Sequence, residues 1–165
     1  MAVPFDYDDG KGVEFEPFDG FLSAEETTIW FRGWTRNGTL SGDDFRIFGQ
    51  DGTGGYAALW LVRQDQALVE QPVVFLGSEG ETGVVARDLG DFLWLMADGL
   101  GPREAADPRG CDRAPRPNQA LAAIAEKFAP GQRRSAVSVI EAAAQEFPGF
   151  DDFIMGLCPG LGLSQ

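Results

Sequence analysis

The segment from Phe45 to Leu61 constrains the fold more than any other part of the chain. A short alternating apolar pattern leads into four glycines within seven residues, Gly49, Gly52, Gly54 and Gly55, and an apolar run from Tyr56 to Val62 follows. Alternation is typical of a strand with one buried face, and a continuous apolar run of a strand buried on both faces. Asp51 and the glycines supply turn chemistry. The segment therefore predicts a β-hairpin with these glycines as a structural turn.

Two more strands are expected after the hairpin. Pro72 to Leu76 is a short run of β-favouring residues, and Pro72 stands at its start, where a strand needs no backbone donor. An acidic, glycine-rich turn over residues 77–83 leads into a partner strand, Val84 to Ala86. We expect Tyr56–Leu61 and Val73–Leu76 to be neighbours in one antiparallel sheet, with the next helix packed on its face.

Helices are expected before and after the strands. Ser23 and Glu26 form a capping box that predicts a helix start, and Asp88 is positioned to cap a second helix. Later helices should begin near Asn118 and Ser135, with a last short one ending before Pro159. The apolar sides of the helices comprise Ile29, Trp30, Phe31 and Trp34; Leu89, Phe92, Leu93, Met96 and Leu100; Leu121, Ile124, Ala125 and Phe128; Val139, Ile140, Ala143 and Phe147; and Phe153, Ile154 and Leu157. Helices gathered after strands favour an α+β fold with a mainly antiparallel sheet.

Length and composition favour one soluble domain. The chain has 165 residues and is 44% hydrophobic, with 13 Phe and 4 Trp, which is enough for a packed core. No apolar run reaches the roughly 20 residues of a membrane span, and the N-terminus does not read as a secretory signal. We therefore expect a cytoplasmic protein. Cys111 and Cys158 should be reduced thiols there.

The chain is strongly acidic, with a net charge of −13. Nucleic acid and anionic membranes are not expected as partners, because both repel such a surface, whereas a basic protein would be attracted. The alternative is that the acidity only keeps the protein soluble. The charge is also uneven: residues 1–26 hold eight acids and one Lys, and residues 100–134 hold seven basic residues against four acids.

The sequence contains no histidine. This excludes Ser-His-Asp and Cys-His catalysis and histidine zinc sites, so an enzyme would need carboxylates, Lys, Tyr or Cys. Residues 6–10 resemble the start of a calcium loop, but the spacing fails, and the glycine turn is not followed by Gly-Lys-Ser/Thr. We expect no metal and no cofactor. A thiol at Cys111, between Arg109 and Arg113, lacks a base partner. A hydrolase stays an alternative if a pair of carboxylates converges at one end of the sheet. The candidates are Asp43, Asp44, Asp51, Glu79, Glu81 and Asp88.

The order of elements resembles the SUKH superfamily, which includes the yeast regulator of cell-wall and glucan synthesis and many bacterial immunity proteins. The matching residues are Phe48, Asp51, Gly52, Gly54, Gly55, Leu59, Pro72 to Leu76, Phe92 and Leu93. The resemblance covers residues 22–100. It implies a single SUKH-like domain over 1–165, in which residues 1–20 form an acidic lead-in, 101–116 an exposed loop and 117–158 C-terminal helices.

The resemblance also implies a function. A SUKH immunity protein neutralises a co-encoded toxin by direct binding, which leads us to expect a non-catalytic protein-binding module with a basic toxin domain as its partner. The expected partner-binding residues are loop-borne acids: Asp43, Asp44, Asp51, Glu79 and Glu81. Two alternatives stay open, an intracellular regulatory or scaffold module, as the yeast relative implies, and a carboxylate-dependent hydrolase. The sequence does not indicate an oligomeric state.

Overall fold

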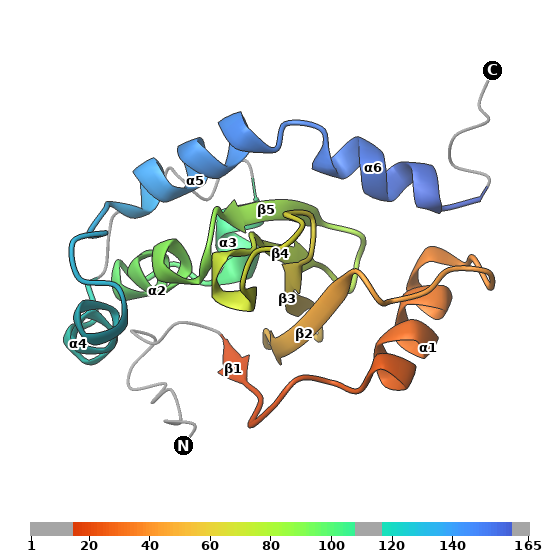
Figure 1. Cartoon of the computed structure of the whole chain (residues 1–165), viewed down its shortest axis with the longest axis horizontal. Coiled ribbons are helices and arrows are strands. Elements are labelled where there is room, and N and C mark those ends of the chain that lie inside the picture. Colours follow the sequence, from red (N-terminus) through yellow and green to blue (C-terminus); the bar gives the residue numbers. More distant parts are fainter. Residues whose placement is uncertain (1–14, 108–116, 160–165) are drawn as a thin grey trace.

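A five-stranded antiparallel sheet with helices on both faces forms the centre of the molecule (Figure 1). The computed structural model describes residues 15–107 and 117–159. The strands follow one another in space in chain order: β1 (Glu16–Pro17), β2 (Phe45–Gln50), β3 (Tyr56–Trp60), β4 (Val73–Leu76) and β5 (Thr82–Ala86). The helices are α1 (Ala24–Thr35), the 3-10 turn η2 (Leu68–Glu70), α2 (Leu89–Ala97), α3 (Pro102–Ala106), α4 (Gln119–Phe128), α5 (Ala136–Glu146) and α6 (Phe150–Leu157). The expected α+β class is confirmed.

The predicted hairpin is formed by β2 and β3. Phe45 pairs with Trp60 at its open end and Gln50 with Tyr56 at its closed end, and β3 pairs on its other side with β4 through Leu59 and Val73. The expected adjacency of these strands is thus confirmed.

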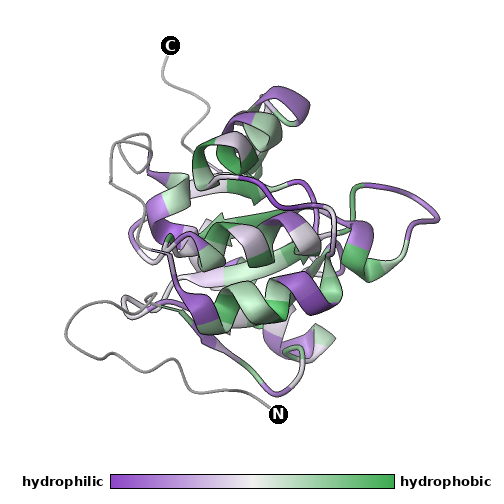
Figure 2. Cartoon of the chain, turned by 90° about the vertical axis from the view of Figure 1, so that its left-hand side faces the viewer, coloured by the Kyte–Doolittle hydropathy of each residue, from purple (hydrophilic) through white to green (hydrophobic). Residues whose placement is uncertain are grey.

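The sheet separates two hydrophobic cores. Because side chains alternate along a strand, Ala57 and Leu59 face one side of the sheet while Ala58 faces the other. The first core joins β3 and β4 to α2, α4 and α5, and it includes Phe92 and Met96 of α2. The second core joins the other face to Phe31 of α1 and to Phe150 and Ile154 of α6. Figure 2 shows hydrophobic and hydrophilic stretches alternating along the helices, as expected of helices with one buried side.

Helix starts agree with the capping residues read from the sequence. The Ser23 hydroxyl accepts from the backbone N–H of Glu26 at 3.1 Å, and the Glu26 carboxylate accepts from the N–H of Ser23 at 3.0 Å. The backbone bond from Ser23 and its hydroxyl lower the pKa of Glu26. Asp88, Asn118 and Ser135 each accept a backbone N–H in the first turn of α2, α4 and α5. The expected N-caps are confirmed.

Four expectations about exposure are wrong. Ile29 is 63% exposed, because the buried residues of α1 are Thr27, Phe31 and Thr35, and a position two residues away points about 200° from that stripe. Phe128, in the last turn of α4, is 69% exposed, and Phe153, in α6, is 40% exposed. Phe15, expected within an acidic lead-in, is instead buried, and its ring meets those of Phe48 and Phe92 edge-on.

The expected exposed loop over residues 101–116 is also wrong in its first part. Residues 102–106 form α3, in which Pro102 and Ala105 are buried. A proline at the first helical position is pre-organised for the helix, and so short a helix has no apolar period to reveal it in the sequence. Residues 1–14 and 108–116, with the calcium-like segment and Arg109, Cys111 and Arg113, lie outside the described residues.

Two glycine substitutions should change stability in opposite directions. A Cβ at Gly49, in β2, would stand 2.3 Å from Cζ of Phe15, whereas a Cβ at Gly33, in α1, would meet nothing within 4 Å. Gly49→Ala should lower the free energy of unfolding by about 1–3 kcal/mol through overpacking. Gly33→Ala should raise it by about 0.5–1 kcal/mol through helix propensity. Urea unfolding measures both. If the two substitutions change the free energy of unfolding equally, Phe15 does not hold β1 against β2.

Candidate functional site

The five predicted partner-binding acids lie at two opposite ends of the sheet. Asp43 and Asp44 precede β2, whose first residue pairs with the last of β3. Asp51 follows β2 at the other end, where Tyr56 pairs with Leu76 and Leu76 with Thr82. The turn that carries Glu79 and Glu81 joins β4 to β5 at that second end. The expectation that all of these acids converge at one end is therefore wrong: Asp43 and Asp44 lie at one end, and Asp51, Glu79 and Glu81 at the other. The carboxylate-dependent hydrolase stays an open alternative.

Asp51 does not face a partner, which corrects its place among the binding residues. Its side chain is 4% exposed, and one carboxylate oxygen accepts from the N–H of Gly55 at 2.8 Å and from the N–H of Thr53 at 3.1 Å. The Thr53 hydroxyl donates to the same carboxylate at 2.8 Å. Asp51 thus holds the β2–β3 turn together. The glycines have different roles: Gly54 has a φ of +91°, and a Cβ at Gly55 would stand 2.5 Å from Cζ of Phe75.

The β4–β5 turn uses one of its two acids internally. Gly77 donates its N–H to the carbonyl of Glu81 at 2.6 Å, and the Glu81 carboxylate accepts from the N–H of Glu79 at 3.2 Å. Gly80 has a φ of +94°, as a tight turn of this kind requires. Glu79 itself is exposed, so of this pair it is the acid that is open to solvent.

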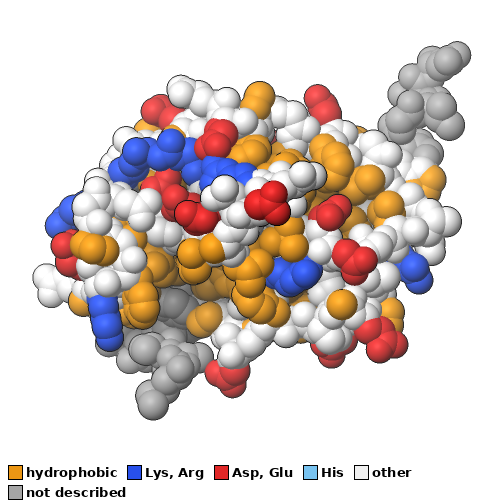
Figure 3. All heavy atoms as spheres, in the orientation of Figure 1, with side chains coloured by type: hydrophobic (Ala, Val, Ile, Leu, Met, Phe, Trp, Pro, Cys, Tyr) orange, Lys and Arg blue, Asp and Glu red, His pale blue; other side chains and the backbone are white. Residues whose placement is uncertain are grey.

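An aromatic cluster lies at the end of the sheet that carries Asp43 and Asp44. The ring of Trp60, at the end of β3, contacts three rings from the junction of α5 and α6: Phe150 at 4.8 Å, Phe153 at 5.5 Å and Phe147 at 5.7 Å between centroids. We call Trp60, Phe147, Phe150 and Phe153 the Trp60 cluster. Phe150 is buried, but Phe153 is 40% exposed. Hydrophobic side chains gather below α5 and α6 on the face in Figure 3, with charged side chains around them.

Arg63 fixes one border of the Trp60 cluster. Its guanidinium lies 5.6 Å from the centroid of the Phe147 ring and pairs with Glu146 at 2.6 Å. It also donates to the carbonyl oxygens of Glu70 and Arg87. One side chain thus ties the chain after β3 to the end of α5.

Acidic side chains border the same cluster on other sides. The N–H of Leu61 donates to the carbonyl of Asp44 at 2.8 Å, which places the exposed Asp43 and Asp44 beside the end of β3. Asp152 stands in the first turn of α6, immediately before Phe153, whereas the carboxylate of Asp151 in the same turn is bonded to Thr82 of β5. The cluster is thus a partly exposed aromatic centre, with Phe153 open to solvent and with acids near it, and such a centre suits contact with a basic surface.

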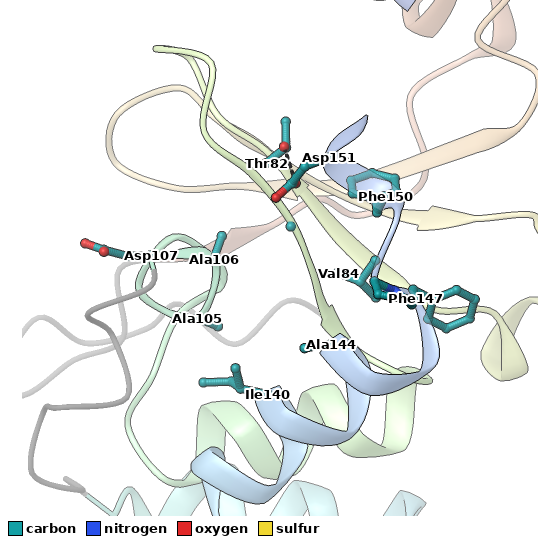
Figure 4. Close-up of a pocket in the computed structure, with 12 residues that line it drawn as sticks. Thr82, Val84, Ala105, Ala106, Asp107, Ile140, Ala144, Phe147, Phe150 and Asp151 are labelled. Carbon is teal, nitrogen blue, oxygen red and sulfur yellow. Dashed lines mark hydrogen bonds between the residues drawn. The ribbon is translucent and has the colours of Figure 1, made fainter. Parts of the chain in front are cut away.

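A cleft of about 340 Å³ lies on the other side of the α5–α6 junction (Figure 4). It is lined by Thr82, Gly83 and Val84 of β5, Ala105 to Asp107, Ile140 and Ala144 of α5, Phe147, Pro148, Phe150 and Asp151. The Thr82 hydroxyl donates to the Asp151 carboxylate at 2.5 Å, which joins the start of β5 to the start of α6. The sequence pointed neither to this cleft nor to Asp151, because both depend on how α6 turns back over β5.

A buried carboxylate, that of Asp91, lies at the start of α2. Asp91 is 0% exposed; one of its oxygens accepts from Nε of Arg87 at 3.2 Å, and the other has no hydrogen-bond partner in the described part of the chain. Burial raises the pKa of Asp91, and the neighbouring Asp88 adds to this, while Arg87 and Arg134 oppose it. Such groups are common at functional sites, but the ion pair of Asp91 with Arg87 is a local i,i+4 contact at the start of α2.

Metal-binding clusters and membrane-spanning helices are both absent from the described residues. There, no three His, Cys, Asp or Glu side chains gather as metal ligands, and no helix has the length and apolar character needed to cross a bilayer. Cys158 is a free thiol. Comparison of the chain with protein-family models, curated proteins and solved structures finds no match. The SUKH resemblance therefore stays an expectation that rests on the residues given above.

Replacement of Asp91 should change the pH dependence of stability. A carboxyl whose pKa is raised by folding contributes most stability below its ordinary value of 3.8 and loses that contribution as pH rises through the raised pKa. Asp91→Asn cannot ionise, so its stability relative to the unaltered protein should improve between about pH 4 and pH 7. Urea unfolding at several pH values measures this difference. A difference that is constant with pH, or that favours the unaltered protein as pH rises, would contradict the assignment.

Proposed function

We propose that the chain is a non-catalytic protein-binding module that captures a basic protein domain on the Trp60 cluster and its acidic rim. The observation that carries the proposal is the partly exposed stack of Phe153 on Trp60, with Asp43 and Asp44 at the same end of the sheet. If the SUKH resemblance holds, the partner is a co-encoded toxin and binding covers its working surface.

The composition of the cluster supports this proposal. Aromatic residues and Arg carry a large share of the energy at protein interfaces, because they offer wide, stiff contact areas. Trp60, Phe147 and Phe150 hold one another in place, so little side-chain entropy remains to be lost on binding. Phe153 is packed on one side and open on the other, as expected of an anchor.

The charge of the protein supports a basic partner. At −13 the chain attracts cationic surfaces over distances up to about 8–10 Å at moderate salt, and this raises association rates. Asp43 and Asp44, at the Trp60 end of the sheet, and Asp152, next to Phe153 in α6, provide that charge near the anchor. A regulatory or scaffold module would use the same surface for several unrelated proteins, whereas an immunity protein would use it for one toxin, so the number of proteins that co-purify separates the two.

Truncation of the anchor should weaken binding of the partner that co-purifies with the chain. Phe153→Ala should lower affinity by about 10–1000-fold, mainly through faster dissociation, because it removes a ring from the centre of the surface. Phe128→Ala, a matched change of an exposed Phe on α4, should leave affinity unchanged. Surface plasmon resonance with the co-purified partner measures both. Equal dissociation rates for the two variants would reject the Trp60 cluster as the binding surface.

Charge reversal at the two ends of the sheet should have unequal effects on association. Asp44→Lys, beside the Trp60 cluster, should slow association and flatten its dependence on salt, because rim charges steer the encounter. Glu79→Lys makes the same charge change at the far end and should slow association less. Rates at several ionic strengths between about 0.02 and 0.3 M compare them. If Glu79→Lys slows association more than Asp44→Lys does, the binding surface lies at the far end of the sheet. If the association rate does not depend on salt, the acidic charge serves solubility and does not steer the partner.

A further inference from the structure

In the described part of the chain, one edge of the sheet carries backbone groups that no strand pairs. β5 is the last strand in the sheet order, and β4 is its neighbour. The N–H of Gly77 donates to the carbonyl of Glu81, so this is a hydrogen-bonded pair, and in an antiparallel ladder such pairs alternate with pairs that are not hydrogen-bonded. Along the observed register, Gly83 and Phe75 therefore form the next hydrogen-bonded pair. Thr82 and Val84 occupy the alternate positions, so their N–H and C=O groups point away from β4.

The residues that carry these outward groups line the cleft at the α5–α6 junction. Thr82, Gly83 and Val84 line the cleft and are partly exposed, while Val85 and Ala86, in the second half of β5, are buried. The end of α3 lies on one side, since a Cβ at Gly83 would stand 3.3 Å from Cβ of Ala106, and Ile140 and Ala144 of α5 lie on the other (Figure 4). An edge strand left open between two walls is a template for an added strand.

The cleft fits a short apolar and basic segment. Its volume of about 340 Å³ is at the small end of ligand-site volumes, and its walls are largely Ala, Ile, Val, Pro and Phe side chains. Asp107 and Asp151 line it, and no Lys or Arg is among its described lining residues. A cationic side chain of an incoming segment therefore meets the carboxylate of Asp151, and no Lys or Arg among the described lining residues opposes it, within a protein of net charge −13.

We propose that this cleft receives an extended basic segment of the partner protein, which adds to the sheet as a strand beside β5. Backbone bonds to Thr82 and Val84 would hold the segment, and its small apolar side chains would pack between α3 and α5, with a Lys or Arg directed to Asp151. This inference rests on the proposed function, because the segment belongs to the protein that the module binds, but it concerns a second and separate contact.

A synthetic peptide tests the cleft without the partner. The probe is the fluorescent-labelled heptapeptide Lys-Val-Thr-Val-Lys-Val-Lys, with both ends blocked, and fluorescence anisotropy measures its binding to the full chain. Two N-methylated forms, one methylated at the odd and one at the even residues, each remove the donors on one edge of the peptide. Because a strand directs alternate N–H groups to opposite edges, one form should lose binding by at least about tenfold and the other should keep it. If both forms bind as the parent does, strand addition is rejected.

Matched variants of the chain locate the peptide. Ala144→Arg places a bulky cation in the cleft and should lower peptide affinity by at least about tenfold, whereas Gln145→Arg makes the same charge change on the next residue of α5, outside the cleft, and should change it less than about twofold. Asp151→Asn should weaken binding more than Asp152→Asn, its neighbour in the first turn of α6. Thermal unfolding verifies that all four variants fold. Equal effects within either pair would overturn the site.

The same variants distinguish an added partner strand from self-association of the chain and from binding at the Trp60 cluster alone. Sedimentation that shows a dimer, dispersed by Ala144→Arg, would mean that β5 pairs with a second copy of the chain and that the inference is wrong. If the co-purified partner binds Ala144→Arg as tightly as the unaltered chain but loses affinity for Phe153→Ala, the cleft is rejected while the proposed function stands. If the peptide binds as expected but Phe153→Ala and Phe128→Ala are alike, the cleft stands and the Trp60 surface fails.

Discussion

The carboxylate of Asp51 holds the turn on which the rest of the sheet depends. It is buried at the closed end of the β2–β3 hairpin and accepts from the backbone N–H groups of Thr53 and Gly55, so the hydrogen bonds that hold the turn lie within the turn itself. Gly55 then leaves room for the ring of Phe75, and so β4 can pair closely with β3. A buried carboxylate with fewer hydrogen-bond donors would carry a desolvation cost in free energy larger than the stability that the turn provides. The acid is therefore part of the scaffold, although its sequence context also suited a binding loop.

Local chemistry is the part of this fold that could be predicted from the sequence. The caps at Ser23, Asp88, Asn118 and Ser135, the hairpin and the pairing of β3 with β4 depend on residues a few positions apart, whose preferences are strong. What could not be predicted depends on long-range packing. The Trp60 cluster joins residues about ninety positions apart, and the burial of Phe15 depends on a glycine in another strand. Neither of these contacts produces a regular spacing of apolar residues in the sequence.

The topology also explains why the predicted acids do not meet. In a meander each strand reverses direction, so successive connections lie at alternate ends of the sheet. The segment before β2 and the β3–β4 connection share one end, and the turns that carry Asp51 and Glu79 share the other. Once four strands in sequence are expected, this separation follows from counting turns. The expectation of a common acidic site considered the composition of the loops without their order.

The α5–α6 junction links the two proposed contacts with the partner. Phe147 and Phe150 contact Trp60 on one side and line the cleft beside β5 on the other, so the same two rings form a shared wall. Asp151 follows in α6 and is held by Thr82 at the start of β5. A folded domain on the Trp60 cluster and an extended segment in the cleft would therefore contact the rings of Phe147 and Phe150 from opposite sides. Because residues in contact do not contribute additively, changes at Phe153 and Ala144 should show coupling in a double-mutant cycle through this wall. The two contacts would then act as one surface in two parts, in which the cluster supplies the anchor and the β5 edge selects a partner that can present a basic strand.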